Sequence, residues 1–172
     1  MREVVILAAA RTPQGRMNGS LASLSAVELG VVASKAALER SGAKVSDIKS
    51  CIFGEVLQAG LGQNPARQIA IGAGLGWDAV ATTINKLCLS GSTAVIDAAR
   101  LIGTGEAEVV LAGGTESMSQ APHLLIGSRK GFNFGDVVVK DHMALDGLTD
   151  AFDKTSMGAC TQVHTDRQTI SR

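Results

Sequence analysis

The chain has few aromatic side chains and no net charge. Aromatic residues make up 3% of its 172 residues, and tyrosine is absent. Proteins that bind single-stranded nucleic acid stack bases on aromatic rings, so the composition argues against that class. Sixteen basic residues balance sixteen acidic ones, and the balance gives no sign of a surface for polyanions. We therefore expect no nucleic-acid partner.

Cysteine is also scarce, and no very long hydrophobic run is present. Cys51, Cys88 and Cys160 lie far apart without CxxC spacing. This spacing argues against a disulfide framework or a metal site and favours a reducing compartment. No apolar run reaches membrane-spanning length, and no charged leader precedes the first apolar segment. We expect a cytoplasmic protein with no membrane partner.

The composition that remains is typical of an α/β fold. Hydrophobic residues make up 45% of the chain, which also has 20 glycines. The continuous apolar run 4–10 predicts a strand covered on both faces. Three further strands are predicted, at residues 51–57, 79–85 and 109–112. Their alternation with helices predicts a layered sheet with parallel pairs.

The predicted helices have recognisable end signals. Ser25 and Glu28 form a capping box that begins a helix running through residue 38, and Gly42 ends it. Asn64 and Pro65 begin a second helix, which runs to about residue 74. The segment 89–102 predicts a third helix that is buried nearly all round, because only two of its residues are charged. Residues 117–153 interrupt the alternation as a long excursion from the sheet.

Cys88 is the candidate nucleophile. It falls between the predicted strand 79–85 and the helix 89–102, where unpaired N–H groups of the first helical turn favour a thiolate. A buried structural cysteine is the alternative interpretation. A helix end contributes roughly 0.3–1 kcal/mol, which is insufficient alone, so an efficient nucleophile also needs a base.

Three histidines are candidates for that base. His123, His142 and His164 are spread over the second half of the chain, and none has a neighbouring pattern that marks it as the partner of Cys88. Each also fits a surface or structural histidine. The sequence leaves the base unassigned.

The segment Asn85-Lys86-Leu87-Cys88-Leu89-Ser90-Gly91 resembles the nucleophile motif of the thiolases, the acetyl-CoA acetyltransferase family. Further similar segments follow the family order along the whole chain: residues 6–13, 54–67, 112–119, 146–152 and 157–158. The resemblance implies a thiolase-like layered α/β sheet with a buried central helix. It implies a thiolase N-terminal α/β domain at residues 1–116 and a loop domain, incomplete at its C-terminal end, at 117–172.

The resemblance also implies an activity and its residues. Cys88 would accept an acyl group from acyl-CoA, and a second acetyl-CoA would attack the thioester to give acetoacetyl-CoA and coenzyme A, or the reverse. Coenzyme A thioesters would be substrates, with no further cofactor. Leu148 and Met157 match positions that line the pantetheine and acyl channel, although both also fit a plain apolar core. Ser156 stands where short-chain members often have a histidine.

The chain is shorter than the family pattern. The second half of a thiolase carries a histidine that activates the nucleophile and a cysteine that moves the substrate proton. We therefore expect a truncated product, a fragment or half of a split enzyme, with little activity alone. We expect a homo-oligomer paired through residues 79–85, or a missing C-terminal half as partner. The alternatives are a non-catalytic lipid-binding or assembly subunit and, less favoured, a 3-ketoacyl synthase.

Overall fold

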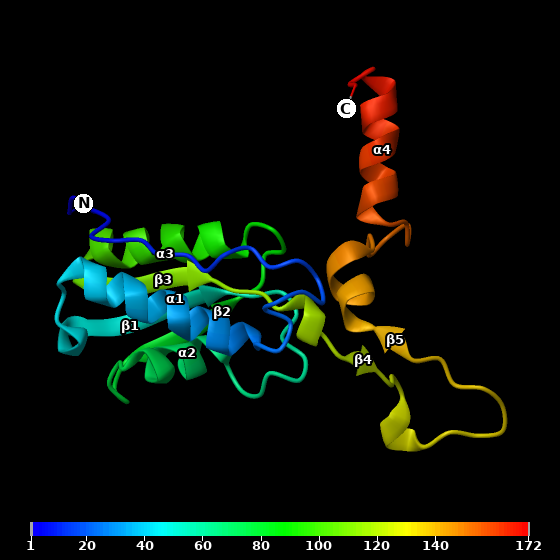
Figure 1. The fold of residues 1–172 in the computed structure, drawn as a ribbon, viewed down its shortest axis with the longest axis horizontal. Helices are drawn as coiled ribbons and strands as arrows, with labels where there is room; N and C mark the ends of the chain where they lie inside the picture. The colour runs from blue at the N-terminus through cyan, green and yellow to red at the C-terminus, as the bar shows by residue number, and fades with distance from the viewer. Residues whose placement is uncertain (1, 172) are drawn as a thin grey trace. The chain divides into compact units, whose positions relative to one another are not determined.

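The computed structural model describes residues 2–171, which form two compact units, residues 2–120 and residues 121–171. The first unit has a three-stranded parallel sheet of order β2-β1-β3 (Figure 1). Its strands are β1 (Ile48–Gly54), β2 (Val80–Ile84) and β3 (Val109–Gly114). At the centre of the sheet, Ile52 pairs with Thr82 on one side and Ala112 on the other. The predicted α/β class is confirmed.

Helices cover both faces of this sheet (Figure 1). Helices α1 (Ala26–Ser41) and α2 (Pro65–Ala73) pack on the face from which Cys51 and Phe53 project. Helix α3 (Ser90–Thr104) packs on the other face, where Ile52 contacts a core that includes Ala94 and Ala98. The alternation of side chains along β1 thus supplies both cores.

The local helix signals produce the expected ends. The Ser25 hydroxyl accepts a hydrogen bond from the Glu28 N–H, and the Glu28 carboxylate accepts one from the Ser25 N–H, so the predicted capping box is confirmed. Gly42 ends α1 with a φ of 67°. Asn64 caps α2, Pro65 is its first residue, and Gly74 follows it with a φ of 100°.

The predicted strand 4–10 is wrong. The segment is assigned to no strand, and Ile6 is 78% exposed. The Arg40 guanidinium of α1 donates a hydrogen bond to the Ala9 carbonyl of this segment. A continuous apolar run indicates a need for cover on both faces, but a strand also requires a neighbouring strand for its ladder. Among the described residues, no strand pairs with this segment.

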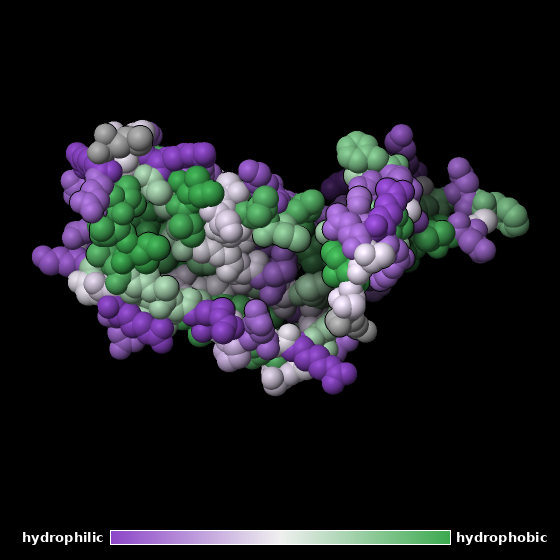
Figure 2. Space-filling model, turned by 90° about the horizontal axis from the view of Figure 1, so that it is seen from above, coloured by the Kyte–Doolittle hydropathy of each residue, from purple (hydrophilic) through white to green (hydrophobic). Residues whose placement is uncertain are grey.

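The prediction that α3 is buried nearly all round is also wrong for the described residues. Ser90, Ala94 and Ala98 are buried, whereas Val95 and Ile96 remain exposed. Ala94, Ala98 and the partly buried Leu101 pack against the sheet, so α3 is covered on this face only. Figure 2 shows hydrophobic side chains gathered over the region of α3 and the N-terminal segment.

The second unit is built from short elements. Strands β4 (His123–Leu124) and β5 (Lys140–Asp141) pair antiparallel, and a π-helix spans Ala144–Leu148. Helix α4 (Met157–Arg167) completes the unit. Three short 3-10 helices, Val45–Asp47, Met118–Gln120 and Ser128–Lys130, lie in connections of the chain. Within residues 2–171, every helix is too short or too polar to cross a bilayer.

The start of α3 approaches the backbone of the sheet at Gly54. A Cβ atom on Gly54 would lie 2.3 Å from the carbonyl carbon of Ser90 and 2.4 Å from the nitrogen of Gly91. These distances are far below van der Waals contact, and both atoms belong to backbone. Glycine at the end of β1 is therefore required for the helix to sit where it does.

We expect Gly54→Ala to lower the free energy of unfolding by about 1–3 kcal/mol, because the added methyl group forces α3 away from the sheet. Gly91→Ala is the matched control, since its Cβ would lie 3.7 Å from the nearest atom. Urea unfolding followed by circular dichroism measures both. Equal losses in the two variants would contradict the steric explanation.

Candidate active site at the carboxyl edge of the sheet

Cys88 lies in the turn between β2 and α3. Strand β2 ends at Ile84 and α3 begins at Ser90, so the turn projects from the carboxyl edge of the parallel sheet. Ligands bind preferentially at this edge in open α/β sheets. The Cys88 side chain is exposed, so the thiol is open to reagents in the described structure.

The end of α3 beside this turn carries no side-chain cap. Leu89 occupies the N-cap position and makes no capping hydrogen bond, while the Ser90 N–H donates to the Leu87 carbonyl at 2.9 Å. The first N–H groups of an α-helix lack acceptors within the helix, and together they give its start a partial positive charge. A helix start of this kind favours negative charge nearby, and the thiolate expected at Cys88 stays a prediction.

The other two cysteines lie in different surroundings. Cys51 is fully buried in β1, its thiol donates to the Ala66 carbonyl at 3.6 Å, and burial raises the pKa of this thiol to about 12. Cys160 is half-buried in α4, with its sulfur 2.9 Å from the Thr155 hydroxyl. Cys51 is thus the inert structural thiol, and the exposed Cys88 remains the candidate nucleophile.

The three other predicted site residues lie together in the second unit. Leu148 ends the π-helix, and Ser156 and Met157 begin α4. A bridge between Thr149 and Ser156 brings the ends of these two helices side by side. Leu148 and Met157 are each 42% exposed, so neither is a fully buried core residue. The Ser156 hydroxyl caps α4 by accepting from the Ala159 N–H at 3.2 Å.

Of the three histidines, His142 has the most distinctive surroundings. It is 5% exposed, and its Nδ1 lies 2.6 Å from a carboxylate oxygen of Asp146. The pair joins the end of β5 to the π-helix that carries Leu148. His123 and His164 are exposed. The sequence signal for the pair, an acid four residues after a histidine, is too common to have identified it.

Sequence reasoning missed two acids at the carboxyl edge. Glu55 directly follows β1, and Glu116 lies two residues after β3. The Glu116 carboxylate accepts hydrogen bonds from the N–H groups of Val56 at 3.0 Å and Leu57 at 3.1 Å. The signal that could have found them is an acid after each of two buried strands, because neighbouring parallel strands end at the same edge.

Glu55 is 1% exposed, and its two carboxyl oxygens have no hydrogen-bond partner among the described residues. Burial, and secondarily the negative charge of Glu116, raises the pKa of Glu55 to about 8. A buried carboxyl group in these surroundings holds its proton at neutral pH. With Glu55 protonated, these two acids contribute at most one negative charge to the edge.

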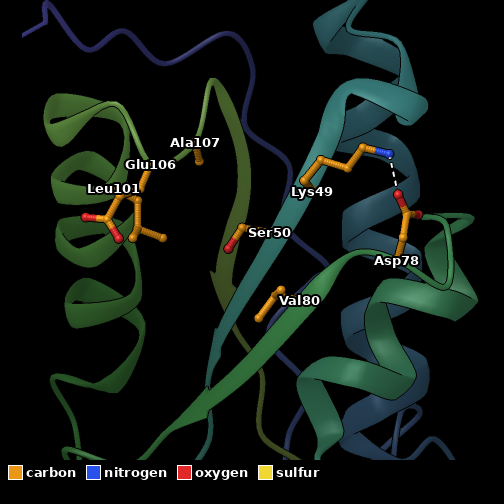
Figure 3. Close-up of a pocket in the computed structure, with 7 residues that line it drawn as sticks. All are labelled: Lys49, Ser50, Asp78, Val80, Leu101, Glu106 and Ala107. Carbon is orange, nitrogen blue, oxygen red and sulfur yellow. Dashed lines mark hydrogen bonds and ion pairs between the residues drawn. The ribbon is translucent and has the colours of Figure 1, made fainter.

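A cavity of about 410 Å³ lies at the opposite edge of the sheet (Figure 3). It is lined by residues at the amino ends of β1 and β2 and at the end of α3, including Ser50, Val80 and Leu101. An ion pair between Lys49 and Asp78, at 2.6 Å, lies at its margin. None of the predicted site residues lines this cavity.

Comparison with known proteins gives the family. The sequence profile described as "Thiolase, N-terminal domain" matches residues 4–172. The chain belongs to the thiolase family. This confirms the resemblance read from the motifs around Cys88, and with it the thiolase-like fold class.

Individual relatives agree. The chain is 52% identical over 172 residues to a "Probable acetyl-CoA acetyltransferase" of Mycobacterium tuberculosis, covering all of this chain and 44% of the relative. It is 54% identical over 158 residues to an "Acetyl-CoA acetyltransferase" of Cupriavidus necator, covering 92% of this chain and 40% of the relative. The chain thus spans less than half the length of these relatives.

A solved structure shares the fold. The Acat5 thiolase from Ascaris suum, crystallised in complex with coenzyme A, superposes with a TM-score of 0.92 at 40% identity. The match covers 96% of this chain and 43% of that one. The α/β layers described above are therefore a thiolase arrangement.

The raised pKa of Glu55 predicts a pH dependence of stability. The folded protein retains a proton that the unfolded chain releases above about pH 4.5, the ordinary value. The free energy of unfolding therefore falls as pH rises from about 4.5 to about 8, by up to about 1.4 kcal/mol per pH unit from this group. Above pH 8 this contribution levels off.

Urea titrations at a series of pH values measure this slope. Glu55→Gln, which mimics the protonated acid, is expected to remove the Glu55 contribution, whereas Glu106→Gln at an exposed acid should leave the profile unchanged. A profile of the Glu55→Gln variant parallel to that of the wild type would show that Glu55 is ionised in the folded protein.

Proposed function

We propose that this chain forms the nucleophile-bearing part of a thiolase-type acyltransferase, with Cys88 as the acyl acceptor. The observation that carries the proposal is the position of Cys88, exposed in the turn between β2 and the uncapped start of α3. Family membership supports it, as do relatives named acetyl-CoA acetyltransferase.

In the first half-reaction, the Cys88 thiolate attacks the carbonyl carbon of acetyl-CoA. Charge develops on the carbonyl oxygen, and backbone N–H groups at the start of α3 are suited to stabilise it. The intermediate collapses by breaking the bond to the coenzyme A sulfur, which leaves and takes up a proton. The acetyl group is then held on Cys88 as a thioester.

In the second half-reaction, another acetyl-CoA loses a methyl proton and its carbon attacks the Cys88 thioester. A carbon–carbon bond forms, the Cys88 sulfur leaves, and acetoacetyl-CoA is released. Thiolysis runs through the same steps in reverse. The reaction transfers an acyl group between thiols and carbon, and we propose that coenzyme A thioesters suffice without a further cofactor.

The thiolase pattern assigns activation of the nucleophile to a histidine, and movement of the substrate proton to a cysteine, of the family's second half. We therefore propose that the chain by itself acetylates Cys88 slowly and does not sustain synthesis of acetoacetyl-CoA. A complementing C-terminal half, or a second copy paired along the edge strand β2, is the proposed partner. The three free thiols support a reducing compartment, which we propose is the cytoplasm.

Incubation with acetyl-CoA followed by intact-mass measurement tests the central step. We expect one added acetyl group, lost in Cys88→Ala and retained in the matched variants Cys51→Ala and Cys160→Ala. Acetylation that persists in Cys88→Ala would refute the assignment. Slow and equal alkylation of Cys88 and Cys51 by iodoacetamide would instead favour a non-catalytic subunit.

The same assay tests Leu148 and Met157 as contacts of the acyl-CoA chain. Truncating either to alanine removes apolar surface, and we expect the half-saturating acetyl-CoA concentration to rise several-fold, roughly the effect of losing 1–2 kcal/mol. Leu145→Ala is the control, because Leu145 lies in the same π-helix with 40% exposure. A rise that Leu145→Ala reproduces would argue against a specific contact.

A further inference from the structure

The turn that carries Cys88 has an unfavourable backbone conformation at Leu87. The φ of Leu87 is 49°, in the left-handed region that residues with a side chain rarely adopt. Such a residue persists only where surrounding contacts hold it in place, and this kind of strain gathers at functional sites. The contacts around Leu87 therefore show what holds the nucleophile turn.

One of these contacts is the hydroxyl of Ser90. It accepts a hydrogen bond from the Lys86 N–H at 2.8 Å and donates one to the Leu87 carbonyl at 2.6 Å. Ser90 is 4% exposed, so water competes little for either bond. A single buried hydroxyl thus links the Asn85–Lys86 peptide group to the Leu87–Cys88 peptide group.

The second contact is the side chain of Asn85. Its Oδ1 accepts a hydrogen bond from the Leu87 N–H at 3.1 Å, and its Nδ2 donates to the Val56 carbonyl at 3.4 Å. The Val56 N–H in turn donates a hydrogen bond to the Glu116 carboxylate. Leu87 is therefore fixed through its N–H by Asn85, and through its carbonyl by both the N–H and the hydroxyl of Ser90.

The Leu87 carbonyl belongs to the peptide group that joins Leu87 to Cys88. Fixing this plane fixes the N–Cα bond of Cys88 and so restricts the directions in which the Cys88 side chain can leave the backbone. We propose that Ser90, assisted by Asn85, is the positioning residue of the Cys88 nucleophile: its buried hydroxyl locks the Leu87–Cys88 peptide and so orients the sulfur. The role of Cys88 as nucleophile rests on the proposed function; the orientation of its thiol does not.

Alkylation by iodoacetamide tests the orientation without a substrate. The variant is Ser90→Ala, and the matched control is Ser34→Ala, which also removes a buried hydroxyl but one without a hydrogen-bond partner among the described residues. Peptide mass spectrometry follows Cys88, with Cys160 as internal reference. We expect Cys88 to react roughly two- to five-fold more slowly in Ser90→Ala, because an unlocked thiol loses the effect of the helix end.

Acetylation by acetyl-CoA gives a second measurement. Because Ser90 holds the sulfur rather than the coenzyme, Ser90→Ala is expected to lower the maximal acetylation rate by about ten-fold or more and to leave the half-saturating acetyl-CoA concentration unchanged. If Ser90 had a purely structural role, Ser90→Ala would lower the free energy of unfolding but would not selectively lower the maximal acetylation rate at an unchanged half-saturating concentration. Ser34→Ala is expected to change neither quantity.

The outcomes separate the two proposals. Equal alkylation of Cys88 in Ser90→Ala and Ser34→Ala overturns the positioning role. If circular dichroism shows that Ser90→Ala does not fold, the same comparison is made with Asn85→Ala at an exposed position, where unchanged alkylation likewise overturns it. If the wild type accepts no acetyl group, the proposed function fails, and the alkylation comparison still decides the positioning role.

Discussion

The close approach of α3 to the ends of two strands is the constraint on which the rest of the site depends. Gly54 ends β1 and Gly114 ends β3, and the backbone of α3 lies against both. Because no side chain separates them, the start of α3 packs directly against the carboxyl edge of the sheet. The turn with Cys88 is the segment that joins them, so its position follows from this packing.

Hydrogen bonds to the Glu116 carboxylate also hold the chain at this edge of the sheet. Glu116 holds the backbone after β1 by accepting hydrogen bonds from two N–H groups, and the Val56 carbonyl accepts one from Asn85, beside the turn with Cys88. These bonds connect the ends of all three strands. A change at Glu116 therefore reaches the turn through a short series of hydrogen bonds, although Glu116 lies 28 positions along the chain from Cys88.

Local signals were sufficient for much of the fold. The capping box at Ser25 and the Asn64-Pro65 start determine helix ends through bonds between neighbouring residues, and both were confirmed. The strand expected at 4–10 and the all-round burial of α3 depend on cover from distant parts of the chain, which an apolar run cannot specify. The place of Cys88 between a strand and a helix could be predicted from the sequence, whereas the exposure of Cys88 and the burial of Glu55 required the three-dimensional packing.

The protonated state of Glu55 has a consequence for the electrostatic potential of this edge. Two ionised carboxylates there would disfavour negative charge on any group in the adjoining turn. A neutral Glu55 removes one of these charges, and the two backbone N–H groups that bind Glu116 offset part of the other. The edge thus holds two acids beside the turn with Cys88 but carries less negative charge than two ionised carboxylates would give it.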